Sequence, residues 1–284
     1  MKVAIIGSNG QLGTDLVKTF SEKHDVVSLT HEQIEITNLS NCHEVITSIK
    51  PDLLITTAAM HQVEKCEEDP ELSFRVNALG TRNLAVAAHN TGSQFVFFST
   101  DYVFDGKKQK PYIETDAGRP LNVYGNSKLS GENFALTVCP RSYVVRVSGL
   151  YGNSECRQKR SLNFVKLMMK LGKEREFVRV VDNEVLSPTW TQEIAQQLER
   201  LVKTESFGLY HMVSEGQCSW HAFAKEIFKL SNATARLEVA DPNEFRGKVA
   251  RPEFSALDNA NLNKLKLNQM SDWKDALKKY ISQL

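Results

Sequence analysis

The stretch that decides the fold is VAIIGSNGQLG, residues 3–13. An apolar run leads directly into Gly7, Gly10 and Gly13, and a helical pattern follows at once. Glycines permit a tight turn and let the backbone approach a pyrophosphate, while free N–H groups at the start of the next helix attract the anion. A glycine triplet alone is weak evidence. Its position between an apolar run and a helix predicts a dinucleotide-binding turn.

Beyond this turn, short apolar runs alternate with helical patterns. The runs are VVSL, DLLITTA, FVFFST, YVVRVSG and FVRVV, and the helical patterns include LSNCHEVITSIK and TRNLAVAAHN. Strands that are apolar throughout are typical of a parallel sheet covered on both faces. The sequence therefore predicts an α/β fold with a Rossmann-like, doubly wound parallel sheet.

The alternation weakens after Gly149, where helical patterns such as NFVKLMMKLGK and SWHAFAKEIFKLS prevail. We expect residues 1–150 to form a dinucleotide-binding domain, with 177–205 returning to it. Residues 151–284 are expected to form a smaller, mainly helical substrate-binding domain. Trp220 and Phe223 have the spacing of core residues on one of its helices.

Composition narrows the class of partner. Charged residues make up 24% of the 284-residue chain and the formal net charge is +1, so neither nucleic acid nor an anionic membrane is expected as a partner. The first apolar run is too short for a signal peptide, and no run reaches the roughly 18 residues of a membrane helix. Five cysteines without close pairing indicate reduced thiols and no zinc site. We expect a cytoplasmic protein with a small-molecule ligand.

A second motif, YGNSK at residues 124–128, predicts the chemistry. Tyr124 and Lys128 are four residues apart and share one face if the segment is helical. An ammonium beside a phenol lowers the phenol pKa, which would make Tyr124 a tuned proton donor. Thr100 ends the FVFFST run, where open α/β sheets bind ligands, and its hydroxyl would hold a substrate carbonyl. The set predicts hydride reduction of a carbonyl, with Lys128 also bonding the nicotinamide ribose.

Cofactor preference is predicted from the end of the second strand. That strand ends at Thr30 and His31, with no carboxylate until Glu32, so a 2′-phosphate would meet no charge repulsion. No arginine is present there to bind the phosphate either. NADP(H) is therefore the preferred cofactor and NAD(H) is possible, with the segment from Glu35 to Thr37 lining the adenine pocket.

These motifs resemble the extended short-chain dehydrogenase/reductases, and within them the dTDP-4-dehydrorhamnose reductases. The resemblance covers nearly the whole chain, most specifically in STDYVFDG and PLNVYGNSK. It implies a Thr/Tyr/Lys catalytic set at Thr100, Tyr124 and Lys128, and reduction of the 4-keto group of a dTDP-linked 6-deoxy sugar. Related dehydratases have an Asp-Glu pair after the threonine, whereas Asp101 and Tyr102 follow it here, so dehydration is disfavoured.

The resemblance also implies binding residues in a chain that is a monomer or a homodimer. Besides the catalytic set, the cofactor would contact Gly7, Asn9, Gly10, Gln11, Leu12, Thr30, Glu35, Ile36, Ala58, Ala59, Met60, Asn77 and Ser99. The nucleotide sugar would contact Val63, Thr100, Asp101, Tyr102, Asn163 and Arg251.

Several positions depart from the family pattern near the expected sugar pocket. Gly149 stands where the family has a tryptophan, His61 where it has a threonine, and Glu64 where it has an aspartate. An extra stretch, NSECRQKRS at residues 153–161, follows Tyr151, and its basic part CRQKRS (156–161) receives no function. Two alternatives remain: a reductase of another nucleotide-linked 4-keto sugar, or a non-catalytic regulatory subunit resembling the β subunit of methionine adenosyltransferase.

Overall fold

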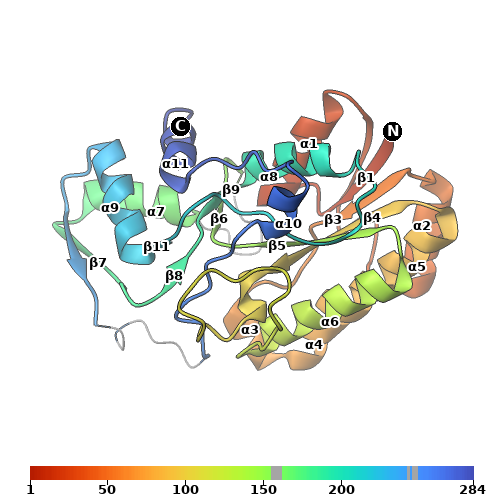
Figure 1. Ribbon diagram of the computed structural model, residues 1–284, viewed down its shortest axis with the longest axis horizontal. Helices are drawn as coiled ribbons and strands as arrows, with labels where there is room; N and C mark the ends of the chain where they lie inside the picture. Colours follow the sequence, from red (N-terminus) through yellow and green to blue (C-terminus); the bar gives the residue numbers. More distant parts are fainter. Residues whose placement is uncertain (155–161, 242–243, 245–248) are drawn as a thin grey trace.

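The structure is a computed structural model that describes residues 1–154, 162–241, 244 and 249–284. The basic run at 156–161 and most of the extra stretch therefore lie outside the described residues. The rest of the chain forms two lobes, a larger one built on a sheet and a smaller one at the other end of the molecule (Figure 1). None of the helices in the described ranges is both long enough and apolar enough to cross a membrane.

A six-stranded parallel sheet forms the centre of the larger lobe. Its strand order is β10-β5-β4-β3-β1-β2, and every neighbouring pair is parallel. The strands are β1 (Lys2–Ile6), β2 (Asp25–Leu29), β3 (Leu53–Thr56), β4 (Gln94–Thr100), β5 (Ser142–Val147) and β10 (Gly208–His211). Strands β3, β4 and β5 are buried along their whole length, as strands covered on both faces must be. The predicted Rossmann-like fold class is confirmed.

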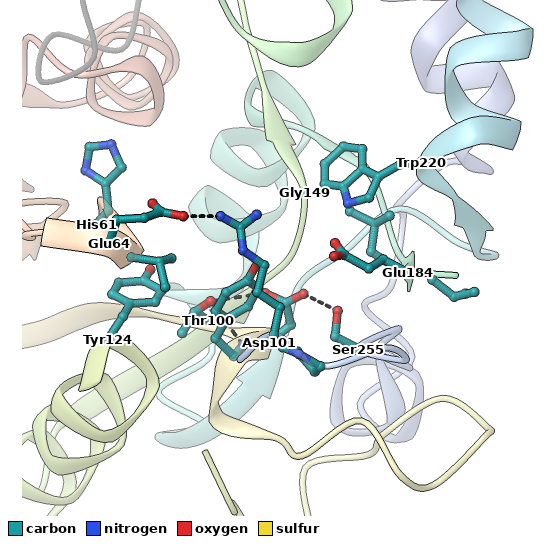
Figure 2. A pocket seen from close by; sticks show the side chains of 15 residues that line it. His61, Glu64, Thr100, Asp101, Tyr124, Gly149, Glu184, Trp220 and Ser255 are labelled. Atoms are coloured by element: carbon teal, nitrogen blue, oxygen red, sulfur yellow. Dashed lines mark hydrogen bonds and ion pairs between the residues drawn. The ribbon is translucent and has the colours of Figure 1, made fainter. Parts of the chain in front are cut away.

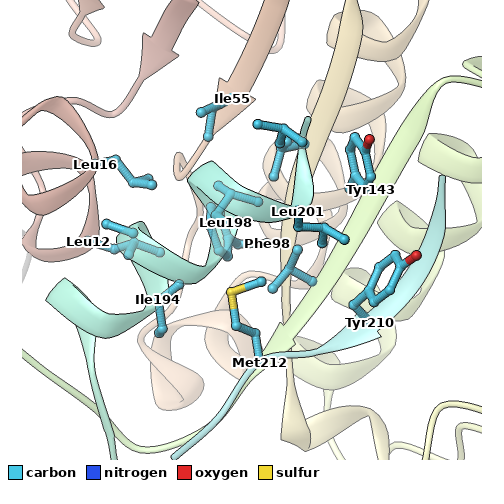
Figure 3. Close-up of a cluster of buried hydrophobic side chains, with 14 of the residues drawn as sticks. Leu12, Leu16, Ile55, Phe98, Tyr143, Ile194, Leu198, Leu201, Tyr210 and Met212 are labelled. Atoms are coloured by element: carbon cyan, nitrogen blue, oxygen red, sulfur yellow. The ribbon is translucent and has the colours of Figure 1, made fainter. Parts of the chain in front are cut away.

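Helices cover both faces of this sheet (Figure 1). On one face, α1 (Gln11–Ser21) and α8 (Thr191–Leu201) bury leucines and isoleucines against the strands, as Figure 3 shows for Leu16, Ile194 and Leu198. On the other face, α2 (Leu39–Ile49), α5 (Thr81–Thr91) and α6 (Val123–Val138) enclose a second apolar cluster. The sheet is thereby shielded, and only its strand ends remain for ligands.

Shorter elements connect the strands on the α6 side. They are α3 (Val63–Glu68), α4 (Pro70–Phe74), the π-helical segment η1 (Arg75–Gly80) and the 3₁₀ turn η2 (Asp101–Val103). Single π-helical turns are rare and frequently lie at functional sites.

The smaller lobe combines helices with short strands around its own apolar cluster. It contains β6 (Leu150–Tyr151), α7 (Phe164–Glu174), β7 (Phe177–Val180), β8 (Val185–Leu186), β9 (Thr189–Trp190), β11 (Cys218–Ser219), α9 (Trp220–Ser231), β12 (Arg236–Val239) and α11 (Trp273–Ile281). The strands form three separate pairs, β11-β8, β12-β7 and β6-β9.

The chain passes repeatedly between the two lobes. After β6 to β9 in the smaller lobe it returns to the larger one, where α8 packs beside α1 and β10 extends the sheet. It then forms β11, α9 and β12 in the smaller lobe. Next, α10 (Ala260–Lys264) packs against β10 in the larger lobe, and the chain ends in the smaller lobe with α11. Within the span 177–205, α8 lies against the sheet, whereas β7 pairs with β12 in the smaller lobe.

Candidate active site

The glycine turn lies between β1 and α1 with the backbone geometry that phosphate binding needs. Gly7 has a φ of 76°, in the left-handed region, and a Cβ on Gly13 would lie 2.1 Å from the Gly7 carbonyl oxygen. At the start of α1, the N-cap residue Gly10 offers no side chain to the free N–H groups. Those groups are therefore available to an anion.

A dinucleotide fits the donor groups at this turn. The buried Gln11 amide nitrogen has no hydrogen-bond partner among the described residues, and an unpaired buried donor is costly. Gly10 and Leu12 belong to the same turn and helix start, and Asn9 precedes them. Cofactor phosphates would satisfy both the helix N–H groups and this amide.

The predicted catalytic residues come together at the carboxyl end of the sheet. Thr100 ends β4, while Tyr124 and Lys128 lie one turn apart on α6, whose N-cap Asn122 accepts a hydrogen bond from the Gly125 N–H at 2.9 Å. Thr100 and Tyr124 line one cavity of about 250 Å³, and a hydrogen bond links their side chains. The Lys128 ammonium lies 4.2 Å from the Phe97 ring centroid, behind Tyr124 on α6.

Burial dominates the electrostatics of this set, which corrects one prediction. Burial raises the pKa of the Tyr124 phenol, and the Thr100 hydrogen bond opposes that rise. Burial lowers the pKa of Lys128 to about 7, against the attraction of Glu132. The expected lowering of the Tyr124 pKa by Lys128 is therefore wrong for the ligand-free chain. A phenol with a raised pKa stays protonated at neutral pH, the state a proton donor requires.

Asn77 on η1 ties the cofactor side of the site to α6. Its amide exchanges two hydrogen bonds with the Met60 backbone, both 2.9 Å long, and donates a third to the Ser127 hydroxyl at 3.0 Å. Ser127 in turn donates to the Tyr124 carbonyl oxygen at 2.8 Å. Asn77 thus holds the loop after β3 against the helix that carries Tyr124.

Asp101 supports the floor of the cavity. Its buried carboxylate accepts hydrogen bonds from Thr100 at 3.0 Å, Ser148 at 2.8 Å and Ser255 at 2.6 Å. Burial raises its pKa, and these three hydroxyls oppose the rise. The cavity floor is therefore joined to β4, to the end of β5 and to the C-terminal part of the chain.

The far wall comes from the smaller lobe and from the C-terminal segment. Figure 2 shows Glu184 and Trp220 across the cavity from Tyr124 and Glu64. Arg251 pairs with Glu64 at the cavity edge. Gly149 has a φ of 55°, and a Cβ there would lie 2.6 Å from the Leu186 side chain and 3.0 Å from the Pro188 backbone. The tryptophan that the family resemblance implies at 149 would not fit this backbone.

The other predicted residues divide into two groups. Val63, Tyr102 and Arg251 line the cavity with Thr100 and Tyr124. Several of the remaining residues have structural partners. Glu35 accepts from the Thr37 N–H and hydroxyl, Thr30 bonds to Gln33, and Ser99 donates to Glu132. Ile36 is buried under η1, and the backbone N–H of Ala58 donates to Thr56. Ala59 and Met60 continue that loop.

Asn163 lies apart from the cavity. It caps α7 by accepting from the Lys166 N–H at 3.0 Å, and its amide donates to the Gly152 carbonyl oxygen and the Tyr280 hydroxyl. Sequence reasoning missed Glu184, Ser255 and the cavity face of Trp220, since none belongs to a local motif. Trp220 packs on Phe164 as well, which explains its helix-core spacing.

Comparisons with known proteins agree with this geometry. The whole chain, residues 1–284, matches the RmlD substrate binding domain family. A dTDP-4-dehydrorhamnose reductase from Aggregatibacter actinomycetemcomitans is 35% identical over 98% of this chain and 97% of its own. A dTDP-4-dehydrorhamnose reductase structure from Clostridium acetobutylicum has a TM-score of 0.95 at 37% identity, covering 100% of this chain and 99% of that one.

A second solved structure adds a ligand. The dTDP-4-dehydrorhamnose reductase from Bacillus anthracis, in complex with NADP, has a TM-score of 0.95 at 35% identity, covering 100% of this chain and 99% of its own. The family model and both solved structures match essentially the whole chain. The chain belongs to the RmlD substrate binding domain family and, within it, to the dTDP-4-dehydrorhamnose reductases.

Proposed function

We propose that the protein reduces the 4-keto group of dTDP-4-dehydro-L-rhamnose to give dTDP-L-rhamnose, with NADPH as the preferred reductant. The observation that carries this proposal is the shared cavity of Thr100 and Tyr124, with Lys128 one helical turn away and the glycine turn at the same end of the sheet. The relative from Bacillus anthracis that binds NADP supports the choice of cofactor.

Each residue of the set has a distinct task in this reaction. The nicotinamide supplies a hydride when bound. With substrate bound, the Thr100 hydroxyl turns its one proton from Asp101 to the keto oxygen, and Tyr124 gives that oxygen a proton as negative charge develops there. The raised pKa keeps that proton on Tyr124 until the charge appears. Lys128, with no protein hydrogen-bond partner to its ammonium among the described residues, is positioned to hold the ribose.

The walls of the cavity support a sugar nucleotide as substrate. Arg251 at the cavity edge is a cation suited to a diphosphate, and Glu64 holds it there in the ligand-free chain. A bidentate guanidinium is the side chain best matched to phosphate oxygens. The change at Gly149 concerns the sugar ring and not the reacting carbonyl, so other 4-keto sugars belong in the test.

The test follows oxidation of NADPH and NADH with dTDP-4-dehydro-L-rhamnose, generated in place by the upstream enzymes. Turnover should fall by a factor of about 10²–10⁴ in Tyr124→Phe, because general acid catalysis contributes that much. Cofactor binding, measured by fluorescence, should persist in this variant. Turnover only with a different 4-keto sugar would replace the substrate, and cofactor binding without any turnover would support a regulatory subunit.

A further inference from the structure

Two residues of the cavity have no task in the proposed reaction. Glu184 precedes β8, and Trp220 is the first residue of α9, so both belong to the smaller lobe. Both line the cavity that contains Thr100 and Tyr124. In Figure 2 they lie on the side of the cavity opposite Tyr124, with Thr100 and Asp101 between the two sides.

The Glu184 carboxylate is partly buried and only partly satisfied. Burial raises its pKa, whereas the charge of Arg251 and a hydrogen bond from the Trp220 side chain lower it. No other hydrogen bond to this carboxylate occurs within the described ranges. A carboxylate has about four acceptor sites, so capacity to accept hydrogen bonds remains on the cavity side.

Trp220 is held in place from behind. Its ring packs on Phe164 with a centroid distance of 4.5 Å, and the backbone N–H of Trp220 donates to the Glu184 carbonyl oxygen at 3.3 Å. These contacts hold Trp220 beside Glu184, and both residues line the cavity. Nearby, Leu186 fills the space in front of Gly149, so residue 149 supplies no side chain to this wall.

The two residues together match one chemical feature of a sugar ring. A pyranose offers hydroxyl donors along its edge and apolar C–H groups on its face. An anionic acceptor beside an aromatic ring pairs with both at once. Because the cavity is only about 250 Å³, a ring whose keto oxygen contacts Thr100 and Tyr124 extends toward the opposite wall.

We propose that Glu184 accepts a hydrogen bond from the ring hydroxyl adjacent to the reacting carbonyl, and that Trp220 positions this carboxylate and lies against the ring. The pair thereby selects which nucleotide sugar is reduced. This inference rests on the proposed function, since it assigns a specificity role at the same site.

The test compares two substrates in two enzymes. The 4-keto sugar nucleotide and its analogue lacking the hydroxyl at C3 are assayed with the unmodified enzyme and with Glu184→Ala. The unmodified enzyme should favour the hydroxylated substrate in kcat/KM by about 10- to 100-fold, the range of a hydrogen bond to a charged group. Glu184→Ala should lose most of that preference and leave the deoxy analogue nearly unaffected. Glu184→Gln, which keeps an acceptor, should lie between the two.

Glu253→Gln is the matched control, since Glu253 is an exposed carboxylate whose charge acts on Glu184 but which does not line the cavity. It should retain the full preference. Equal loss on both substrates in Glu184→Ala would overturn the inference. If the unmodified enzyme reduces neither sugar, the proposed function fails. In that case, calorimetry measures the difference in affinity between the 4-hydroxy product and its 3-deoxy analogue. The inference is overturned if Glu184→Ala leaves this difference in affinity unchanged, or if neither ligand binds.

Discussion

The two walls of the cavity are built in different ways. Thr100 and Tyr124 are carried by β4 and α6, a fully buried central strand and a sixteen-residue helix. On the other wall, Glu184 lies just before a two-residue strand and Trp220 is the first residue of a helix. Arg251 lies in an irregular segment. The difference shows that the chemical wall is fixed by long, well-packed elements, whereas the recognition wall can change by single substitutions without disturbing the sheet.

Gly13→Ala tests the side of the site that is expected to bind the cofactor. Its Cβ would lie 2.1 Å from a backbone oxygen of the same turn, so the turn must shift. A displacement of about 1 Å at a binding site can cost about 100-fold, and we expect at least that loss in NADP affinity. Titration of cofactor fluorescence measures it.

Gly10→Ala is the paired control in the same turn. Its Cβ would be 3.3 Å from the nearest atom, the Gly7 carbonyl oxygen, which a small adjustment accommodates. Equal losses in the two variants would contradict the close-approach explanation for Gly13.

Thr100→Val tests the chemical wall at its hydroxyl. The variant removes a hydrogen-bond donor from the keto oxygen, and loss of one such donor costs about 10²–10³ in kcat. Thr100→Ser keeps the hydroxyl and should recover most of the rate. Steady-state kinetics with both variants distinguishes the two cases, and a Ser variant as slow as the Val variant would indicate that packing of the methyl group matters instead.

Gly149→Ala tests whether the recognition wall can accommodate a side chain at position 149. The residue has a φ of 55° and the added Cβ would meet the Leu186 side chain, so the free energy of unfolding should fall by about 1–3 kcal/mol. In a Leu186→Ala background, Gly149→Ala should cost less free energy of unfolding than it does in the unmodified protein. The steric contact is then gone and only the backbone strain remains. Chemical denaturation of all three variants measures this coupling, and strict additivity would mean that the two side chains do not meet.

The smallest expected effect is a pH dependence of cofactor binding. Burial lowers the Lys128 pKa to about 7 in the ligand-free chain, so the ammonium is present below that pH and is lost as pH rises through it. If the charged form binds the cofactor better, NADP affinity should fall above pH 7, by at most about tenfold per pH unit. In Lys128→Met the dependence of NADP affinity on pH should be flatter over the same range. Any titration of the cofactor's own phosphate affects both proteins equally, so the variant controls for it.

Sequence alone predicted the parts of the site whose chemistry is local. The glycine turn and the Tyr124/Lys128 pair each lie within a few residues, and their spacing carries the geometry. Burial does not follow from spacing, which is why the Tyr124 pKa was predicted in the wrong direction. In β7, the alternation of exposed Phe177 and Arg179 with buried valines marks a strand covered on one face, and this strand lies outside the central sheet.

Arg251 and Gly149 were expected near the sugar from the family resemblance, but Glu184 and Trp220 were not, because they meet the other two only in the folded chain. Residues 149, 184, 220 and 251 are separated by dozens of positions and belong to no shared motif. Trp220 has the helical spacing of a core residue, and one side of its ring does pack in the smaller lobe. The spacing of the residues around Trp220 does not indicate that the ring also lines a cavity.

The interleaving of the two lobes has a consequence for how such proteins diversify. Because the chain leaves and re-enters each lobe several times, no single continuous segment carries the recognition wall. Recombination that exchanges one block between two relatives would bring part of a foreign wall together with part of a native sheet. New sugar preferences are therefore expected to arise by successive point substitutions, and chimeras with a single crossover are expected to inherit neither parent's preference.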